Sequence, residues 1–366
     1  MGNGLRNKSL IIRMKKIDYI IIGQGLAGTL LAFFLLEQGQ NILIIDNFTE
    51  GGSSKIAAGV VNPVTGRRIV KSWRIDDFLP FAKKTYQRLE NQYNIKIWHD
   101  TSIIRTLKNA EDENDWLLRS SWADYQPFCK HILPPSVFLD KIKPFYGYGE
   151  IQQAAQVDLS RLLSFFTEKW LNEGILRQEK FVYEDVITDE KGVFYKNFKA
   201  KKIVFCEGAA AVKNPFFNYL PFNLDKGELL IVKIPNAGFT KIFKNNISIV
   251  PLKEKDHYWV GATNEWNSVH DLPTDEKKEL IIKELREILT VDFEIIDHKA
   301  AFRPTVKDRR PLLGFHPHHP NLAIFNGLGT KGASLAPYWA EHFMSVLLWG
   351  EKLEHDVDIQ RCQILK

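Results

Sequence analysis

The most regular hydrophobic pattern of the chain lies near its N-terminus. Tyr19 to Ile22 form a short apolar run that is followed by glycine, which predicts a buried strand. Thr29 to Gln38 are good helix formers, and Gly39 ends the predicted helix. A second apolar run, Ile42 to Ile45, predicts another strand. The order of strand, tight turn, helix and strand is that of a βαβ unit.

The predicted turn of this unit carries the glycine pattern of a nucleotide-binding site. Gly23 permits the turn, Gly25 lets the backbone approach a pyrophosphate, and Gly28 lets the helix pack close to the strand. The free amides of the helix N-terminus then face the phosphates. Asp46 ends the second strand, where an acid accepts the ribose hydroxyls. Glycines in a loop often mark only a turn, but here the strands, the helix and the acid all agree, so a nucleotide site is the better interpretation.

The stretch that follows is harder to interpret. Residues 51–68 are small and polar without a clear period, which predicts a loop or the start of a tightly packed helix. A surface connection is one interpretation, and close approach to a flat cofactor ring is the favoured one. Phe78 to Asn91 carry a helical apolar stripe, whereas Ile95 to Phe145 predict short strands, with the charged Asn109 to Asp115 as a hairpin tip. The tryptophans of this part are expected to serve packing: Trp98, Trp116 and Trp122.

The second half of the chain returns to βαβ-like patterns. Asp158 begins a predicted helix that runs to Leu171 and is ended by Gly174. Ile175 to Tyr183 and Lys202 to Phe205 have the composition of strands. We infer that segments far apart in the sequence complete the nucleotide-binding sheet, and that a second domain is inserted between them.

The C-terminal third predicts that second domain and a further glycine-rich turn. Asp275 to Leu289 predict a charged amphipathic helix, and Asn321 to Asn326 predict a strand. The strand leads into the turn 327–334 and then a helix to about Trp349, so free amides face anionic groups a second time. Three apolar runs with turn-rich spacers predict an antiparallel sheet: Leu229 to Val232, Ile247 to Val250 and Tyr258 to Gly261.

These patterns predict an α/β fold with a Rossmann-like nucleotide-binding domain and a second domain built on an antiparallel sheet. Met14-Lys15-Lys16 directly precedes the first strand, so we expect the residues before it to be dispensable. We assign 14–80, 150–220 and 300–366 to the discontinuous nucleotide-binding domain, and 81–149 and 221–299 to the substrate domain.

Composition narrows the class of protein. The 366 residues, 45% of them hydrophobic, suffice for roughly two domains. The net charge of +5 comes from charges that are scattered in short pairs. This distribution is compatible with nucleic-acid binding but does not require it. Cys129, Cys206 and Cys362 form no CxxC or Cys/His cluster, which argues against disulfides and a zinc site. Without an apolar run of ~18 residues or a signal peptide, we expect no membrane association, no metal and a cytoplasmic location.

The whole set of motifs resembles the D-amino-acid-oxidase-like (DAO) family of FAD-dependent oxidoreductases. That family includes glycine oxidase, sarcosine oxidase and the flavin domain of the bifunctional enzyme that completes methylaminomethyl-thiouridine in tRNA. The resemblance covers nearly the whole chain and implies FAD in a glutathione-reductase-type domain. No cysteine or histidine stands where a bond to the flavin can be argued, so we expect the FAD to be bound non-covalently. It rests on Gly23, Gly25 and Gly28, Ser54 with 57–59, Lys226-Gly227-Glu228, 260–263, 302–305 with Asp308, 311–314 and 327–334.

The resemblance also implies how the FAD lies. Residues 57–59 would lie along the isoalloxazine, Phe181 and Val182 would contact adenine through their backbone, and 206–208 would pass near the pyrophosphate. The turn 327–334 would hold the pyrimidine edge, where a helix N-terminus stabilises the negative charge of reduced flavin. The expected FAD contacts are Gly23, Gln24, Gly25, Leu26, Ala27, Gly28, Asp46, Asn47, Ser53, Ser54, Ala57, Ala58, Gly59, Val60, Phe181, Val182, Cys206, Glu207, Gly208, Gly327, Leu328, Gly329, Thr330, Lys331 and Gly332.

Two cations are the expected catalytic residues. Arg303 matches the family position whose arginine holds the substrate carboxylate with its planar fork, although an ion pair between domains is an alternative role. Lys331 stands where relatives often have arginine, and it would add a second positive group. Ser248 stands where glycine-oxidase-like relatives have tyrosine, so glycine as substrate does not transfer with the resemblance.

The resemblance implies an enzyme that oxidises the C–N bond of a small amine, namely an amino acid or an N-substituted glycine, by hydride transfer to FAD. A second hypothesis is a tRNA-modifying flavoenzyme that removes a carboxymethyl group from a modified uridine. Arg67-Arg68 and the basic net charge suit RNA, but the methyltransferase domain of that family is not in this sequence, so tRNA is not favoured. A third is a flavin-binding protein of unknown substrate, since the segment Asn62 to Arg68 has no assigned role. The oligomeric state is not predicted.

Overall fold

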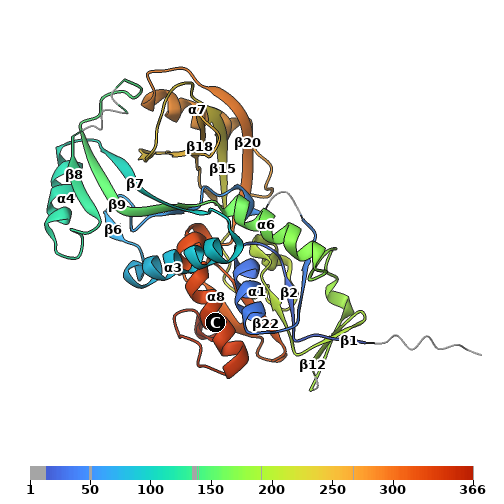
Figure 1. The fold of residues 1–366 in the computed structure, drawn as a ribbon. Coiled ribbons are helices and arrows are strands. Elements are labelled where there is room, and N and C mark those ends of the chain that lie inside the picture. The colour runs from blue at the N-terminus through green and yellow to red at the C-terminus, as the bar shows by residue number, and fades with distance from the viewer. Residues whose placement is uncertain are drawn as a thin grey trace, which may run out of the picture.

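The computed structural model describes residues 14–48, 52–133, 138, 140–190, 192–266 and 268–365. Figure 1 shows a part that is rich in helices, around a six-stranded sheet, and a second part built on a ten-stranded sheet. Within these described ranges, no helix is both long and apolar enough to cross a bilayer.

The six-stranded sheet forms the nucleotide-binding core that the sequence predicts. Its strand order is β10-β3-β2-β14-β22-β21, and all neighbours are parallel except β21 and β22. Its strands come from three distant parts of the chain, which confirms the predicted non-contiguous assembly. They are β2 (Tyr19–Ile22), β3 (Ile42–Asp46), β10 (Leu176–Gln178), β14 (Lys202–Phe205), β21 (Leu312–Phe315) and β22 (Leu322–Asn326).

One face of this sheet is covered by helices. Helix α1 (Leu26–Glu37) is buried from Leu26 to Leu35, so it lies inside the molecule and is apolar all round. Helices α3 (Ile75–Tyr93), α6 (Leu159–Asn172) and α8 (Gly332–Trp349) pack around it in one hydrophobic cluster (Figure 1). Asp158 caps α6 by accepting a hydrogen bond from the amide of Arg161, as its sequence predicts.

The opposite face is covered by a small four-stranded sheet in the order β1-β13-β12-β11. Its aromatic and aliphatic side chains pack against those of β2, β3 and β14 in a second hydrophobic cluster. The strands are β1 (Lys15–Lys16), β11 (Val186–Asp189), β12 (Gly192–Tyr195) and β13 (Phe198–Ala200).

The ten-stranded sheet follows the order β19-β15-β18-β17-β16-β7-β9-β4, with β20 on β15 and β8 on β9. The predicted antiparallel pairing of the central runs is confirmed, and the pair β16 and β7 is parallel. Its strands are β4 (Val60–Val61), β7 (Trp98–Leu107), β8 (Cys129–Ile132), β9 (Gly147–Val157), β15 (Asp225–Lys233), β16 (Ile242–Lys244), β17 (Ser248–Pro251), β18 (His257–Gly261), β19 (Glu265–Trp266) and β20 (Glu294–Arg303).

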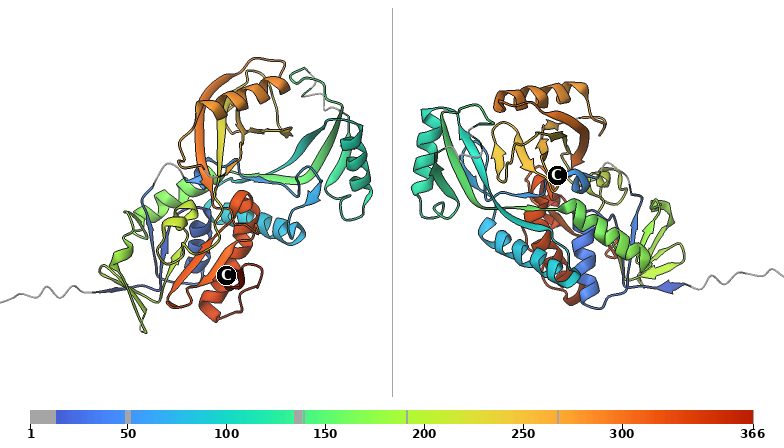
Figure 2. Two further views of the ribbon diagram at one scale, coloured as in Figure 1. Left: turned by 180° about the vertical axis from the view of Figure 1, so that it is seen from behind. Right: turned by 45° about the horizontal axis from the view of Figure 1, so that its top comes forward.

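The ten-stranded sheet has two chemically different faces. Its outer face packs on α7 (Asp275–Ile288), which lies at the end of the molecule remote from α8 in the views of Figure 2. Its inner face carries Trp259, whose indole Nε1 donates to the carbonyl of Ile56, 2.9 Å away. The inner face is therefore the one that meets the helix-covered part. Remaining elements are α2 (Ser53–Ile56), α4 (Ala110–Ser121), β5 (Val64–Thr65), β6 (Val70–Lys71), η1 (Tyr183–Asp185), η2 (Gly208–Lys213), η3 (Gly329–Lys331) and η4 (Ile359–Leu365).

Two local predictions are wrong. The charged segment Asn109 to Asp115 is not a hairpin tip but the start of α4, where the Asn109 side chain accepts a hydrogen bond from the amide of Asp112. Three acidic residues in the first turn of α4 stabilise the helix, because their negative charges lie at the positive end of its dipole. Ile175 to Tyr183 holds only the short strand β10 before it turns into η1.

The tryptophans of this region behave differently from one another. Trp98 and Trp116 are buried, as predicted, whereas Trp122 is 44% exposed and lies under the guanidinium of Arg119. The helical stripes at α3 and α7 are confirmed.

The division into domains remains a proposal. We propose that 14–80, 150–220 and 300–366 form the nucleotide-binding domain and 81–149 and 221–299 the second. Strand β9 runs through residue 150 and β20 through residue 300, so each of these boundaries lies inside a strand of the ten-stranded sheet.

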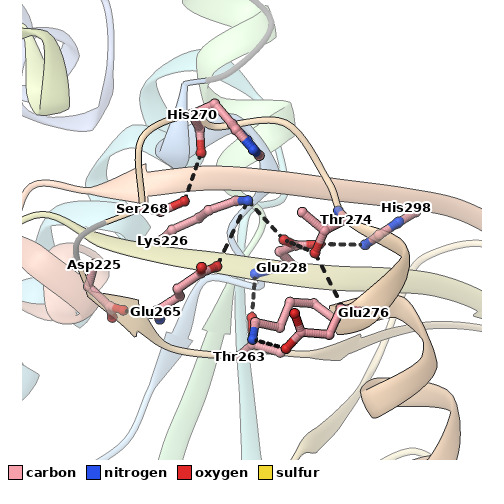
Figure 3. Close-up of polar contacts among 11 residues, drawn as sticks. Asp225, Lys226, Glu228, Thr263, Glu265, Ser268, His270, Thr274, Glu276 and His298 are labelled. Atoms are coloured by element: carbon pink, nitrogen blue, oxygen red, sulfur yellow. Dashed lines mark hydrogen bonds and ion pairs between the residues drawn. The ribbon is translucent and has the colours of Figure 1, made fainter.

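A buried ion pair joins β15 to its neighbours on the outer face (Figure 3). Lys226 Nζ lies 3.0 Å from Glu228 Oε1, and both side chains are fully buried. Glu228 also accepts hydrogen bonds from the amide and the hydroxyl of Thr274, the N-cap of α7, and lies 2.9 Å from His298 of β20. Burial alone would raise the pKa of Glu228, but the hydrogen bonds from Thr274 and Lys226 lower it. This cluster connects β15, β20 and α7.

Replacing Glu228 with glutamine should destabilise the fold. The amide keeps an acceptor for Thr274 but leaves the buried Lys226 charge with only the more distant carboxylate of Glu265, 4.0 Å away, which costs about 3 kcal/mol. Thermal and urea unfolding measure the loss. The double variant Lys226→Met with Glu228→Gln removes both charges and should recover part of it. A single variant as stable as the wild type would show that the ion pair does not contribute.

Candidate active site

The glycine turn after β2 forms a tight cradle. Gly23 has φ +99°, and a Cβ there would lie 2.5 Å from the carbonyl oxygen of Cys206. A Cβ at Gly28 would lie only 2.0 Å from the carbonyl oxygen of Gly23. No side chain caps α1 at Gly25, and the amide of Leu26 points to the hydroxyl of Ser54 at 3.3 Å. The turn thus brings helix amides and a hydroxyl together, as a pyrophosphate requires.

The acid at the end of β3 is held in position by backbone amides. Asp46 accepts a hydrogen bond from Gln24 N and another from Phe48 N, each at 2.6 Å. Each carboxylate oxygen has two lone pairs, so Asp46 retains capacity to accept ribose hydroxyls. Asn47, the next residue of the predicted set, is exposed.

The segment after α2 runs between the two sheets. Gly59 has φ +67°, and a Cβ there would lie 1.8 Å from the carbonyl oxygen of Val157, so only glycine fits. Ala58 is half-buried and Ala57 is exposed. Trp259 fixes the start of this segment through its hydrogen bond to the Ile56 carbonyl, and the small side chains that follow would let a planar ring approach. Ser53 and Val60, at the two ends of this segment, are half-buried.

The predicted adenine end is occupied by protein contacts. Phe181 stacks on Tyr195 with ring centroids 4.5 Å apart, and the amide of Val182 donates to the Tyr195 hydroxyl. Glu207 accepts hydrogen bonds from the Tyr183 hydroxyl and from Asn214 Nδ2. Burial raises the pKa of Glu207, and these two donors oppose that shift. Both backbone groups of Val182 are therefore used within the protein, because its carbonyl also accepts a hydrogen bond from the amide of Asp185.

The second glycine turn opens α8 directly beside α1. Gly327 and Gly329 have φ of +75° and +55°, and a Cβ at Gly332 would lie 3.3 Å from Leu26 Cδ2. Leu328 is buried, Thr330 is exposed, and no side chain caps the N-terminus of α8. The N-termini of α1 and α8, neither of which has a side-chain cap, lie close together. These features fit FAD, whose pyrophosphate and pyrimidine edge are both electron-rich.

Lys331 lies in a positively charged environment. Its Nζ donates to the hydroxyl of Ser72 at 3.2 Å. Burial lowers the pKa of Lys331, and the charges of Arg309 and Arg310 lower it further. Arg310 itself stacks on the ring of Trp73, 4.0 Å from its centroid.

The segment from Asn62 to Arg68 is tied to the site through Ser72. The Ser72 hydroxyl donates to the carbonyl of Asn62, and its amide donates to the carbonyl of Pro63. At the other end, the guanidinium of Arg105 donates to the carbonyl of Gly66 at 2.7 Å. Arg67 and Arg68 are both exposed. The segment therefore bridges the Lys331 turn and the inner face of the ten-stranded sheet.

Arg303 forms an ion pair, which the sequence analysis gave as its alternative role, but with a partner that the sequence analysis did not name. Its Nη1 donates to Asp225 Oδ2 at 2.6 Å and to Asn264 Oδ1 at 3.0 Å, and its Nη2 donates to the carbonyl of Thr263 at 3.1 Å. The guanidinium lies over Gly227, where a Cβ would come within 1.9 Å of Nη2. Burial raises the pKa of Asp225, and the charge of Arg303 opposes that shift.

Register explains why Asp225 was missed. Asp225 is directly opposite Arg303 in the pairing of β15 with β20, and period-two alternation places it with Gly227 on the inner face. The sequence shows the alternation but not which residues are paired across strands. Arg303 and Lys331 are not in contact: among the described residues, no hydrogen bond or ion pair joins them.

Among the residues that the structure describes, no group of three or more His, Cys, Asp or Glu side chains is placed to hold a metal ion.

Comparison with known proteins agrees with this picture. The family model described as FAD dependent oxidoreductase (DAO) matches residues 18–345. The glycine oxidase of Bacillus licheniformis is 23% identical over 359 residues, which cover 91% of this chain and 94% of the relative. The crystal structure of glycine oxidase from Bacillus cereus superposes with a TM-score of 0.78 at 19% identity, covering 92% of this chain and 96% of that one.

A solved iminodiacetate oxidase from Chelativorans sp. BNC1 is similar, with a TM-score of 0.77 at 20% identity, covering 94% of this chain and 98% of that chain. The match spans both sheets and both glycine turns. The chain therefore belongs to the DAO family of FAD-dependent oxidoreductases.

Proposed function

We propose that this enzyme oxidises the C–N bond of an amino acid or N-substituted glycine. Similar proteins are named for glycine and iminodiacetate, which both carry an amine next to a carboxylate. The observation that carries the proposal is the position of Arg303. It ends β20 on the inner face, the face whose Trp259 contacts the segment expected to lie along the flavin.

Asp225 leaves part of the Arg303 guanidinium available. Arginine has five N–H groups, and three hydrogen bonds to Asp225, Asn264 and Thr263 use three of them. The remaining N–H groups suffice for a substrate carboxylate, while the three existing contacts hold the guanidinium plane in place. Because its guanidinium is already fixed, Arg303 would thus orient the substrate without losing further side-chain freedom on binding.

The remaining residues of the site position charge. When bound, FAD supplies the hydride acceptor. The α1 amides and Ser54 would hold its pyrophosphate, and Asp46 its ribose. Lys331 and the α8 N-terminus would stabilise the negative charge that collects at the pyrimidine edge on reduction.

Arg303→Ala should abolish turnover or raise the KM for the amine by roughly tenfold or more, because a charge-assisted hydrogen bond contributes about 1.5–3 kcal/mol. Flavin content should stay unchanged, since Arg303 lies on the substrate side. Arg286→Ala, which removes an exposed arginine from α7 on the outer face, is the matched control. Normal kinetics in the Arg303 variant would reject the assignment.

Activity should fall as pH rises through the pKa of Lys331. That pKa is lowered, so Lys331 loses its proton, and with it the charge that stabilises anions, at a lower pH than an ordinary lysine does. The pH profile of kcat/KM measures this alkaline limb. Lys331→Arg should move the limb to higher pH, because arginine remains protonated. An unmoved limb would assign it to another group.

Gly28→Ala should yield protein with little or no FAD, because the added Cβ cannot fit 2.0 Å from the Gly23 carbonyl without moving α1. The ratio of flavin absorbance to protein absorbance after purification is the measurement. Gly52→Ala is the control, since Gly52 has an ordinary negative φ and its Cβ would touch only the flexible Lys55 side chain. Equal flavin content in both variants would contradict the predicted pyrophosphate site.

A further inference from the structure

A pair of cations lies on the inner face of the ten-stranded sheet, in the two successive strands on one side of the strand of Ser248. Arg105 of β7 is opposite Lys244 of β16, and Lys244 is opposite Ser248 of β17. Paired residues project from the same face, so the three side chains form a row. The row continues from Ser248 to Gly261 of β18. We call Arg105 and Lys244 the cation pair.

The row is on the inner face because of the alternation along β17. Val250, two residues after Ser248, is opposite Trp259, whose indole bonds Ile56. Ser248 therefore faces the helix-covered part, and the cation pair lies on the same side. Arg105 also contacts the segment Asn62 to Arg68 directly, through its hydrogen bond to the carbonyl of Gly66.

The charges of the cation pair are not neutralised. Among the described residues, neither side chain forms an ion pair: Lys244 Nζ donates to the carbonyl of Asn246 at 3.3 Å, and Arg105 donates only to backbone carbonyls. The negative charge of Asp112, in α4, acts to raise the pKa of Arg105. By contrast, Lys241, which directly precedes β16, lies 2.7 Å from Glu150.

This arrangement costs free energy in the absence of an anion. Both side chains are half-buried, and like charges directly opposite one another on a sheet destabilise it. Burial and the neighbouring Arg105 charge lower the pKa of Lys244 to about 8, and burial also lowers the pKa of Arg105. A bound anion would relieve both the repulsion and the loss of solvation.

We propose that Arg105 and Lys244 bind a second anionic group, a carboxylate or a phosphate-type group, on the amine substrate. The inference rests on the proposed function, in which Arg303 receives the first carboxylate. Ser248 supports it, because the side chain next to Lys244 in the row is short. The preferred substrate is then an amino acid or N-substituted glycine with an acidic arm.

The test is calorimetric binding to the FAD-loaded enzyme of ligands that carry no amine. Thiodiacetate has two carboxylates, (phosphonomethylthio)acetate replaces one of them with a phosphonate, and (methylthio)acetate has only one anionic group. We expect the wild type to bind at least one dianion more tightly than the monoanion, and the preferred dianion identifies the acidic arm.

Two variants localise that preference. Lys244→Gln and Arg105→Gln should each weaken binding of the preferred dianion roughly tenfold or more and leave the monoanion unaffected. Lys241→Gln, which removes a lysine already paired with Glu150, should change neither. If Arg105→Gln loses flavin or unfolds at lower temperature, the result of Lys244→Gln is the one that counts, because Lys244 bonds only the adjacent turn at Asn246. Unchanged dianion binding in Lys244→Gln, or equal weakening of the monoanion, would overturn the proposal.

Oxidation is a separate readout. Sarcosine and iminodiacetate are added anaerobically to the same proteins, and flavin absorbance is followed. If dianion binding depends on the cation pair but neither amine bleaches the flavin, the anion subsite stands and the proposed amine oxidation fails. If sarcosine bleaches the flavin while dianion binding ignores the cation pair, amine oxidation stands and the subsite is wrong.

Discussion

The close approach of two helix N-termini is the constraint on which the site depends. α1 can start directly beneath the β2 turn because Gly28 has no Cβ to meet the Gly23 carbonyl, and α8 can start beside it because Gly332 leaves room for Leu26. Neither helix is capped by a side chain. Two helix N-termini therefore lie together, with the Leu26 amide donating to the Ser54 hydroxyl, and their partial positive charges favour an elongated, electron-rich ligand between them.

The chemistry of the second part depends on the alternation along β15. Asp225 and Gly227 face inward, where Arg303 lies across the bare glycine, whereas Lys226 and Glu228 face outward under α7. One short motif thus performs two tasks. Its outer residues fix the strand to β20 and α7, and its inner residues hold a guanidinium in a defined plane.

Local patterns predicted the elements but not the pairings between them. The glycine turns, the apolar runs and the helical stripes are encoded within short windows, so the α/β class and the two glycine turns could be predicted from sequence. The prediction for Asn109 to Asp115 was wrong because a run of acidic and polar residues is typical both of a hairpin loop and of the start of a helix. The Asp225–Arg303 pair spans 78 residues, and the opposition of Arg105 and Lys244 needs the register of a parallel pair, so neither is visible in a local pattern.

The central claim is that this member of the DAO family removes a hydride from an amine that is held by its carboxylate. Anaerobic titration of the flavin absorbance with glycine, sarcosine, iminodiacetate, D-amino acids and L-proline tests it most directly. The account predicts that at least one of these amines bleaches the flavin and that the Arg303→Ala protein, with its flavin still bound, needs far higher concentrations. A flavin that stays oxidised with every one of them would contradict the account.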